Sequence, residues 1–436
     1  MKALIMAGGK GTRLIEITKN LLPKPMVQLN KKTLLEYAIE NLMDYGIDEI
    51  FISIGYMHEI IENYFKNKDY GIKITFIVEN ETLGSGGALY YLKNKIDGNF
   101  IVCMGDALFN INIDKMLKFH ESNNSLATML THPNSHPYDS DLIISNNNYK
   151  VLRIDNKNNS RTFYYKNNVN AGFFIINSKA LNYFDKLKKV SMEGDFINSL
   201  LYNGENVFAY KSTEYIKDLG TPERYYQALD DIKYNLPKKR NLKNKQKAIF
   251  LDRDGTLNVY KGFLKDKKDL ELIDGVIDAI RLINQSEYLA IIVSNQPVIA
   301  RGECTFEEQE EIFSKLETLL GESGVYIDGF YYCPHHPHNG YDREVKVLKC
   351  DCECRKPKIG MLMKAVEDFN LDLDKCVIIG DTDVDIKTGK NANIQTFRVL
   401  SGKCEESKEK EDYKFNNLYD AIKFILERGT YENYNK

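Results

Sequence analysis

The sequence has almost no excess of either charge and lacks any long apolar run. Its 436 residues contain 59 Lys and Arg against 62 Asp and Glu, a formal net charge of −3. Such a balance gives the chain no overall attraction to nucleic acid or to an anionic membrane. The apolar runs fall short of the ~20 residues that span a bilayer, and glycines interrupt the N-terminus before a signal-peptide core forms. We therefore expect a cytoplasmic protein that binds neither nucleic acid nor membrane; a homo-oligomer is left open.

Cysteine is scarce outside one segment. Of eight cysteines, four lie within the 22 residues 333–354, together with three of the seven histidines. In a cytosolic chain this clustering indicates a metal site more than disulfides. Three thiolates and one imidazole match a tetrahedral structural zinc ion; free thiols are the alternative. The expected ligands are Cys333, His335, Cys352 and Cys354, and Cys350 could replace one of the last two.

The chain has one seam. Residues 233–247 read KYNLPKKRNLKNKQK, which is basic and polar with little apolar periodicity. We expect a linker at 236–246 that joins a domain of residues 1–235 to a domain of residues 247–430. A basic loop inside one large domain is the alternative, since the length allows two or three domains.

Short apolar runs alternate with amphipathic segments on both sides of the seam. This alternation favours an α/β fold with mainly parallel sheets covered on both faces. The expected strands are Ala3–Ala7, Glu49–Ile54, Lys73–Val78 and Asn99–Met104 in the first part and Ala248–Leu251, Leu289–Val293, Gly329–Tyr332 and Val377–Ile379 in the second, with helices at Leu34–Tyr45, Met57–Lys66, Val276–Asn284, Phe306–Gly321, Ile359–Phe369 and Asn417–Glu427.

A glycine-rich turn follows the first strand. Glycines at the carboxyl end of a strand let backbone N–H groups approach a phosphate, and the next helix N-terminus adds a positive dipole. The turn, GGKGTR at residues 8–13, is not a Walker A loop because no Gly-Lys-Ser/Thr follows at that spacing. A tight structural turn is the alternative. Arg13 and Lys24 supply two cations beyond the turn, which suits a triphosphate whose α-phosphorus is attacked while pyrophosphate leaves.

AGGKGTRL followed by PKPM resembles the signature of the sugar-1-phosphate nucleotidyltransferases, and the resemblance covers the first half of the chain. The segment ETLGSGGAL at residues 81–89 is similar to the family's LGTAGAL segment near the base and sugar. The resemblance implies a Rossmann-like domain that pairs a nucleoside triphosphate with a sugar 1-phosphate. The implied residues are Ala7, Gly8, Gly9, Gly11, Thr12 and Gly84 for the nucleotide, Arg13 and Lys24 for catalysis, Asp106 and Asp218 for Mg²⁺, and Asn170, Glu193 and Lys166 for the sugar; Phe163–Tyr165 beside Lys166 could equally be a half-buried strand.

A second site begins where the seam ends. Asp252-Arg253-Asp254-Gly255-Thr256 follows an apolar strand, and two carboxylates two residues apart could bind one cation. An acidic structural or calcium-like turn is the alternative. The pattern resembles the haloacid dehalogenase (HAD) phosphatases. The resemblance implies that Asp252 is the nucleophile that forms an aspartyl-phosphate and that Asp254 first protonates the leaving oxygen and then activates water.

The later HAD motifs follow in order along the chain. Ser294 and Asn295 end a strand, and Ser294 is expected to donate to the phosphoryl oxygens. The remaining expectations are Lys356 as phosphate clamp with Lys358 as the alternative, Arg355 beside it, Asp381 as a Mg²⁺ ligand with Asp252 and Asp254, and Asp385 as a support of the loop.

The expected zinc loop between HAD motifs resembles that of the D-glycero-D-manno-heptose 1,7-bisphosphate phosphatases and of the histidinol-phosphate phosphatases. Fusion favours the first, because removal of a 7-phosphate leaves the sugar 1-phosphate that a nucleotidyltransferase needs. The parallel for a heptose 1-phosphate is a guanylyltransferase.

We therefore predict two Rossmann-like domains, a nucleotidyltransferase followed by a HAD-like phosphatase with a zinc loop. The predicted enzyme removes the 7-phosphate and transfers GMP from GTP to heptose 1-phosphate, giving GDP-heptose and pyrophosphate. It would use Mg²⁺ at both sites and structural Zn²⁺. The alternatives are a transferase for another sugar fused to a histidinol-phosphate type of phosphatase, a nucleotide-sugar-sensing domain on a phosphatase, and a binding knuckle in place of the zinc loop.

Overall fold

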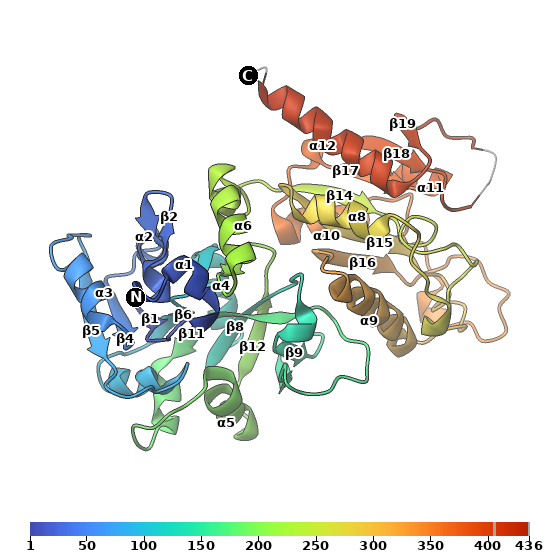
Figure 1. Ribbon diagram of the computed structural model, residues 1–436. Coiled ribbons are helices and arrows are strands. Elements are labelled where there is room, and N and C mark those ends of the chain that lie inside the picture. Colours follow the sequence, from blue (N-terminus) through green and yellow to red (C-terminus); the bar gives the residue numbers. More distant parts are fainter. Residues whose placement is uncertain (404–406, 435–436) are drawn as a thin grey trace. The chain divides into compact units, whose positions relative to one another are not determined.

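The computed structural model describes residues 1–403 and 407–434 and divides the chain into two compact units (Figure 1). The first unit contains Met1–His132, Ser140–Asn159 and Asn168–Asn241, and the second contains Pro133–Asp139, Ser160–Asn167 and Leu242–Lys436. The main division thus falls inside the expected linker.

The expected linker, a basic and polar segment, contains regular structure and buried side chains. It contains the short helix α7 (Leu236–Lys239), and the side chains of Pro237, Arg240 and Leu242 are buried. These residues of the segment are therefore packed, while Lys238, Lys239, Lys243, Asn244 and Lys245 are exposed.

The first unit is built on a nine-stranded mixed sheet, with the path β10-β9-β11-β6-β1-β4-β5 and with β8 joining β11 to β12. Strands β6, β1, β4 and β5 are parallel, as expected, whereas β11 runs antiparallel to β6 and β8. The strands are β1 Lys2–Ala7, β4 Glu49–Ile54, β5 Lys73–Val78, β6 Asn99–Met104, β8 Ala127–His132, β9 Leu142–Ser145, β10 Val151–Asp155, β11 Val169–Asn177 and β12 Val207–Lys211; the small pairs are β2 Gln28–Leu29 with β3 Lys32–Thr33 and β7 Ala107–Asn110 with β13 Tyr215–Asp218.

Both faces of this sheet are covered because its strands are apolar on both sides. Along β1, Ala3 and Ile5 pack into one core and Leu4 packs into the other. A strand that is buried on both faces in this way has a nearly continuous apolar sequence. A capping box formed by Thr33 and Glu36 begins α2. The helices of this unit are α1 Ile15–Thr18, α2 Leu34–Met43, α3 His58–Phe65, α4 Ile113–Ser122, α5 Asn198–Tyr202, α6 Pro222–Lys233 and α7.

The second unit carries, within the described residues, a six-stranded sheet of order β16-β15-β14-β17-β18-β19 in which every pair is parallel. Ile249 and Leu251 of β14 pack into one core, and Ala248 and Phe250 pack into the other. The elements are β14 Lys247–Leu251, β15 Tyr288–Asn295, β16 Gly329–Cys333, β17 Val377–Gly380, β18 Gln395–Val399, β19 Tyr413–Phe415, α8 Val276–Asn284, α9 Phe306–Glu322, α10 Gly360–Phe369, α11 Asp383–Asn391 and α12 Leu418–Tyr434.

This topology places the chemistry at the carboxyl ends of parallel strands, where open α/β sheets bind ligands. Leu251, the last residue of β14, is in register with Ile292 of β15 and Ile379 of β17. The residues that follow these strands therefore meet at one edge of the sheet. None of the helices in the described ranges is both long and apolar enough to cross a membrane.

Candidate active sites and metal centre

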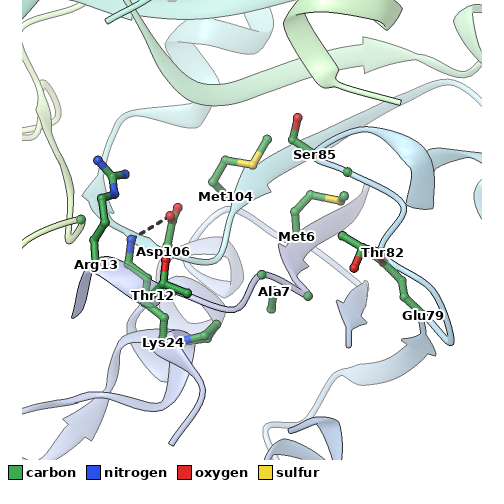
Figure 2. A pocket seen from close by; sticks show the side chains of 16 residues that line it. Met6, Ala7, Thr12, Arg13, Lys24, Glu79, Thr82, Ser85, Met104 and Asp106 are labelled. Carbon is green, nitrogen blue, oxygen red and sulfur yellow. Dashed lines mark hydrogen bonds and ion pairs between the residues drawn. The ribbon is translucent and has the colours of Figure 1, made fainter. Parts of the chain in front are cut away.

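A pocket lies at the carboxyl end of β1 in the first unit (Figure 2). It brings together residues from the glycine-rich turn, the segment after β5 and the end of β6. Every residue expected to bind the nucleotide lines it, together with both expected catalytic cations and one expected Mg²⁺ ligand: Ala7, Gly8, Gly9, Gly11, Thr12, Gly84, Arg13, Lys24 and Asp106.

Lys24 is the buried cation of this pocket. Its ammonium group lies 2.8 Å from Asp106 Oδ2 and 3.5 Å from Asp218 Oδ1, so it joins the two carboxylates expected to hold Mg²⁺. Gly11 is required for this approach: its φ of 60° is left-handed, and a Cβ there would lie 2.7 Å from Lys24 Cβ. Arg224 at the start of α6 forms an ion pair with Asp218.

The two aspartates fit Mg²⁺ by donor type. Mg²⁺ is usually bound by one or two carboxylates, with substrate phosphate oxygens and waters completing the shell. The side chains of Asp106 and Asp218 are 44% and 39% exposed, so both can reach a bound phosphate.

The expected sugar contacts separate into two groups. Asn170 donates a hydrogen bond of 2.6 Å to Glu193, and burial raises the pKa of that carboxyl. Lys166 does not join them: it belongs to the second unit, where its ammonium pairs with Glu310. The alternative of a strand at Phe163–Tyr165 is also wrong, because the segment is irregular.

The second site is a buried cluster of charges at the carboxyl ends of β14 and β17. Lys356 lies 2.8 Å from Asp252 Oδ1 and 2.5 Å from Asp385 Oδ1. Burial and the neighbouring carboxylates raise the pKa of Asp252, against the effect of Lys356. Burial lowers the pKa of Lys356, but Asp252 and Asp385 outweigh it and raise the pKa. The lysine therefore stays charged beside the expected nucleophile.

Asp252, Asp381 and Asp385 form the group that could hold a cation, since one oxygen from each lies within 4.8 Å of the others. Asp381 is wedged between glycines: a Cβ on Gly255 would lie 2.5 Å from its Oδ2, and a Cβ on Gly402 would lie 2.0 Å from it. The other oxygen, Oδ1, is buried without a hydrogen-bond partner. A buried acceptor of this kind fits a site that binds Mg²⁺.

Asp254 is not in this carboxylate group, contrary to expectation. Its carboxylate accepts hydrogen bonds from Arg253 (2.8 Å), Gln296 (2.9 Å) and Asn258 (3.0 Å). Burial raises its pKa, but the Arg253 charge and these bonds outweigh burial and lower the pKa. Asp254 is therefore held as a base next to the cluster, and Asp385 takes its place among the clustered carboxylates.

Among the other expected phosphatase residues, Asn295 holds the backbone of Lys356, and the rest bond to other groups. Asn295 exchanges two hydrogen bonds of 3.0 Å with the Lys356 backbone, and Ser294 Oγ accepts a bond of 2.8 Å from Gln296. Arg355 donates to the His335 carbonyl at 2.9 Å. Lys358, the alternative clamp, pairs instead with Asp351 and Glu353.

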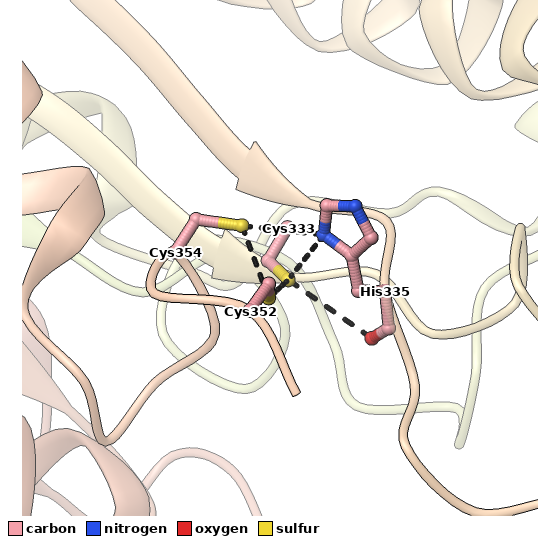
Figure 3. A group of neighbouring side chains, drawn as sticks. All are labelled: Cys333, His335, Cys352 and Cys354. Carbon is pink, nitrogen blue, oxygen red and sulfur yellow. Dashed lines mark hydrogen bonds between the residues drawn. The ribbon is translucent and has the colours of Figure 1, made fainter. Parts of the chain in front are cut away.

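The expected zinc ligands converge from the end of β16 and the loop before α10 (Figure 3). Cys352 Sγ lies 3.5 Å from Cys333 Sγ and 3.3 Å from Cys354 Sγ, and His335 Nδ1 lies 3.3 Å from Cys354 Sγ. A tetrahedral zinc ion with Zn–S bonds of about 2.3 Å holds its ligands about 3.5–3.8 Å apart. The four side chains therefore fit zinc. Cys350 is exposed and lies outside the group.

Several residues of these sites were not expected from the sequence, and two of them are charged groups of the first site. Arg224 and Glu79 carry no motif of their own. Glu79, which lines the pocket directly after β5, had a usable signal: it follows a strand parallel to β4, and strand ends on that side of the sheet carry the site.

Comparisons with known proteins find relatives for both the N-terminal and the C-terminal part of the chain. The nucleotidyl transferase family profile matches residues 2–235, and the HAD-hydrolase-like profile matches residues 353–422. The D-glycero-β-D-manno-heptose-1,7-bisphosphate 7-phosphatase of Pasteurella multocida (strain Pm70) is 39% identical over 184 residues, 41% of this chain and 97% of that protein.

Two solved structures are also similar. HddC from Yersinia pseudotuberculosis is 29% identical and covers 53% of this chain and 99% of its own, with a TM-score of 0.46. The D,D-heptose 1,7-bisphosphate phosphatase from B. bronchiseptica, complexed with magnesium and phosphate, is 24% identical and covers 42% of this chain and 99% of its own, with a TM-score of 0.37.

Proposed function

Because the chain belongs to the nucleotidyl transferase family and, through its C-terminal part, to the family of the D-glycero-β-D-manno-heptose-1,7-bisphosphate 7-phosphatases, we propose that it is a bifunctional enzyme of nucleotide-activated heptose synthesis. One activity removes the 7-phosphate of heptose 1,7-bisphosphate. The other transfers GMP from GTP to heptose 1-phosphate and yields GDP-heptose and pyrophosphate. The observation that carries the proposal is their union on one chain, since the product of the first is the acceptor of the second.

In the phosphatase, Asp252 attacks the phosphorus of the 7-phosphate, and the bond from phosphorus to the sugar oxygen breaks. Asp254 gives that oxygen a proton and then takes one from the water that hydrolyses the aspartyl-phosphate. Since the resting Asp254 is a base, its acid step needs a proton that arrives with the substrate. Lys356 and Ser294 neutralise and orient the phosphoryl oxygens.

In the transferase, an oxygen of the sugar 1-phosphate attacks the α-phosphorus, and pyrophosphate leaves. Lys24 and Arg13 neutralise the charge that grows on the phosphates, and the backbone of the glycine-rich turn binds these phosphates. Asn170 and Glu193 orient the sugar.

We propose Mg²⁺ at Asp106 and Asp218 and at Asp252, Asp381 and Asp385, where it would neutralise phosphate charge. Zinc at Cys333, His335, Cys352 and Cys354 would be structural, because the protein supplies all four ligands. The cytoplasm, which supplies GTP, is the proposed location.

The rival functions have weaker support. Histidinol phosphate would yield a product that the first unit does not use. A sensing domain does not need the two cations and two aspartates that surround the pocket of this chain.

The test supplies the purified chain with each anomer of heptose 1,7-bisphosphate, GTP and Mg²⁺. We expect phosphate, pyrophosphate and GDP-heptose. Phosphate release without any nucleotide-sugar, from either anomer, would contradict the coupled function.

A further inference from the structure

Two segments that precede the expected linker in the sequence belong to the second unit. Pro133–Asp139 connects β8 to β9, and Ser160–Asn167 connects β10 to β11, whereas these four strands belong to the first unit. The second unit, which contains the phosphatase cluster, is therefore built from both halves of the sequence.

The segment Ser160–Asn167 is bonded to buried polar side chains of α9. The hydroxyl of Thr318 accepts a hydrogen bond of 2.9 Å from the backbone N–H of Tyr165. The carboxylate of Glu317 accepts one of 2.7 Å from the backbone N–H of Asn167. Thr318 and Glu317 are 4% and 6% exposed. Because buried polar groups need hydrogen-bond partners, this face of α9 is matched to the segment that covers it.

The segment Pro133–Asp139 packs beside it on the same face of α9. A Cβ on Gly321 would lie 2.4 Å from Pro137 Cγ, so the proline ring lies where a side chain of residue 321 would be. The two segments are also joined to each other. Asn134 donates its backbone N–H to Asn167 Oδ1 at 3.0 Å, and Asn167 Nδ2 donates to the Asn134 carbonyl at 2.7 Å. We call the pair of segments the α9 clasp.

One turn away from Glu317, α9 carries Phe313, which lies against the nucleophile loop. The Phe313 ring centre lies 5.3 Å from the guanidinium carbon of Arg253, a distance typical of a cation–π contact. Arg253 has no exposed surface, and its Nη1 has no hydrogen-bond partner among the described residues. Its other nitrogens bond to Asp254. The ring therefore supports the arginine that stands between Asp252 and Asp254.

We propose that the α9 clasp is a functional part of the phosphatase: it holds α9 where Phe313 supports Arg253, and so it orients Asp254 for the chemical step. Thr318 is then a positioning residue. A misplacement of about 1 Å that starts far from the chemistry can cost about 10²-fold in rate. The inference rests on the proposed phosphatase activity but not on the identity of the sugar.

The first experiment compares Thr318→Val with Thr318→Ser in the full chain. Valine has nearly the shape of threonine but cannot accept the Tyr165 hydrogen bond, whereas serine can. We measure kcat and KM for heptose 1,7-bisphosphate and for p-nitrophenyl phosphate, with Mg²⁺ and well below the Tm. Thr318→Val should lower kcat about 10-fold for both substrates and leave KM unchanged, because Asp254 acts in the chemical step. Thr318→Ser should stay within about twofold of the wild type.

The second experiment tests whether Pro137 packs on α9. In a helix that nothing covers at this position, Gly321→Ala should raise the Tm, because alanine stabilises a helix interior relative to glycine. Against the proline ring, the added methyl group should instead lower the Tm by about 3–6 °C. A rise in Tm would overturn the inference.

A lower Tm of Thr318→Val with a wild-type kcat would mean that the clasp only stabilises the fold, and the inference would be wrong. If Thr318→Val does not fold, the kcat of Gly321→Ala decides, and an unchanged value overturns the inference. A wild-type chain that hydrolyses p-nitrophenyl phosphate but not heptose 1,7-bisphosphate would contradict the proposed function, and the Thr318 variants would still decide this inference with the first substrate.

Discussion

Lys24 donates a hydrogen bond of 2.8 Å to Asp106 within the first pocket. The pair places a buried cation against an expected metal ligand, beside the turn expected to bind the triphosphate. The same ammonium also reaches Asp218, so one lysine orders both aspartates before substrate arrives.

Lys24→Ala should lower the transferase kcat by about 10²–10³-fold, because a placed charge on the phosphates is lost. Phosphate release from heptose 1,7-bisphosphate should be unchanged. Lys10→Ala is the control, since Lys10 lies in the same turn but is exposed and outside the pocket lining. Loss of both activities from Lys24→Ala would contradict separate sites.

Asp252→Asn should lower phosphatase turnover by about 10⁴-fold or more, because the nucleophile is removed. Nucleotide transfer to supplied heptose 1-phosphate should proceed at the wild-type rate. Asp274→Asn, an exposed aspartate of the same unit, controls for charge. Residual phosphatase activity close to the wild type would exclude Asp252 as nucleophile.

Cys352→Ser should release the zinc that we expect in the purified chain and lower the Tm of the second unit by about 5–10 °C. Atomic emission and calorimetry measure the two effects. Cys350→Ser should change neither, because its thiol is exposed and outside the group of four. If Cys350→Ser releases zinc and lowers the Tm while Cys352→Ser does neither, Cys350 rather than Cys352 is the zinc ligand.

Glu36 gives a pH-dependent contribution to stability. Burial raises the pKa of its carboxyl, but hydrogen bonds from Lys68, the Thr33 backbone and Tyr64 outweigh burial and lower the pKa to about 2 from 4.5. A depressed folded-state pKa means that the stabilisation is complete above pH 4.5 and is lost as the pH falls toward 2.

Glu36→Gln should therefore lower the urea midpoint at pH 7, and its difference from the wild type should shrink at pH 3. Glu59→Gln, an exposed change on α3, should have little effect at either pH. A difference that grows on acidification would refute the assignment.

Much of the fold was predictable from the sequence because the parallel strands are buried on both faces. Glu49–Ile54, Lys73–Val78 and Asn99–Met104 have the bounds expected from their apolar runs. The antiparallel part of the first sheet was not predicted. Its strand β11 begins with the buried Val169 and continues with the half-buried Asn170, Ala171 and Gly172, a stretch that shows no clear period.

The sites were predictable where a residue follows a strand and the backbone alone places it. Asp252 is of this kind, since it directly follows β14, whereas Lys24 begins the short 3-10 helix Lys24–Met26 and was indicated by its motif alone. Lys166 and Asp254 differ from the prediction because of the partners they meet. Lys166 pairs with the distant Glu310, and Asp254 accepts hydrogen bonds from the distant Gln296 as well as from the adjacent Arg253.

Because Asp381 is packed against Gly402, the residue at position 402 indicates whether the phosphatase site is intact. Any side chain there would collide with the carboxylate, although position 402 lies 150 residues beyond the nucleophile and outside every recognisable motif. Among related two-part chains, one with a larger residue at this position should have abandoned dephosphorylation and kept nucleotide transfer. Such a chain would depend on another protein for its heptose 1-phosphate, so a single glycine would report whether the pathway step is still performed in cis.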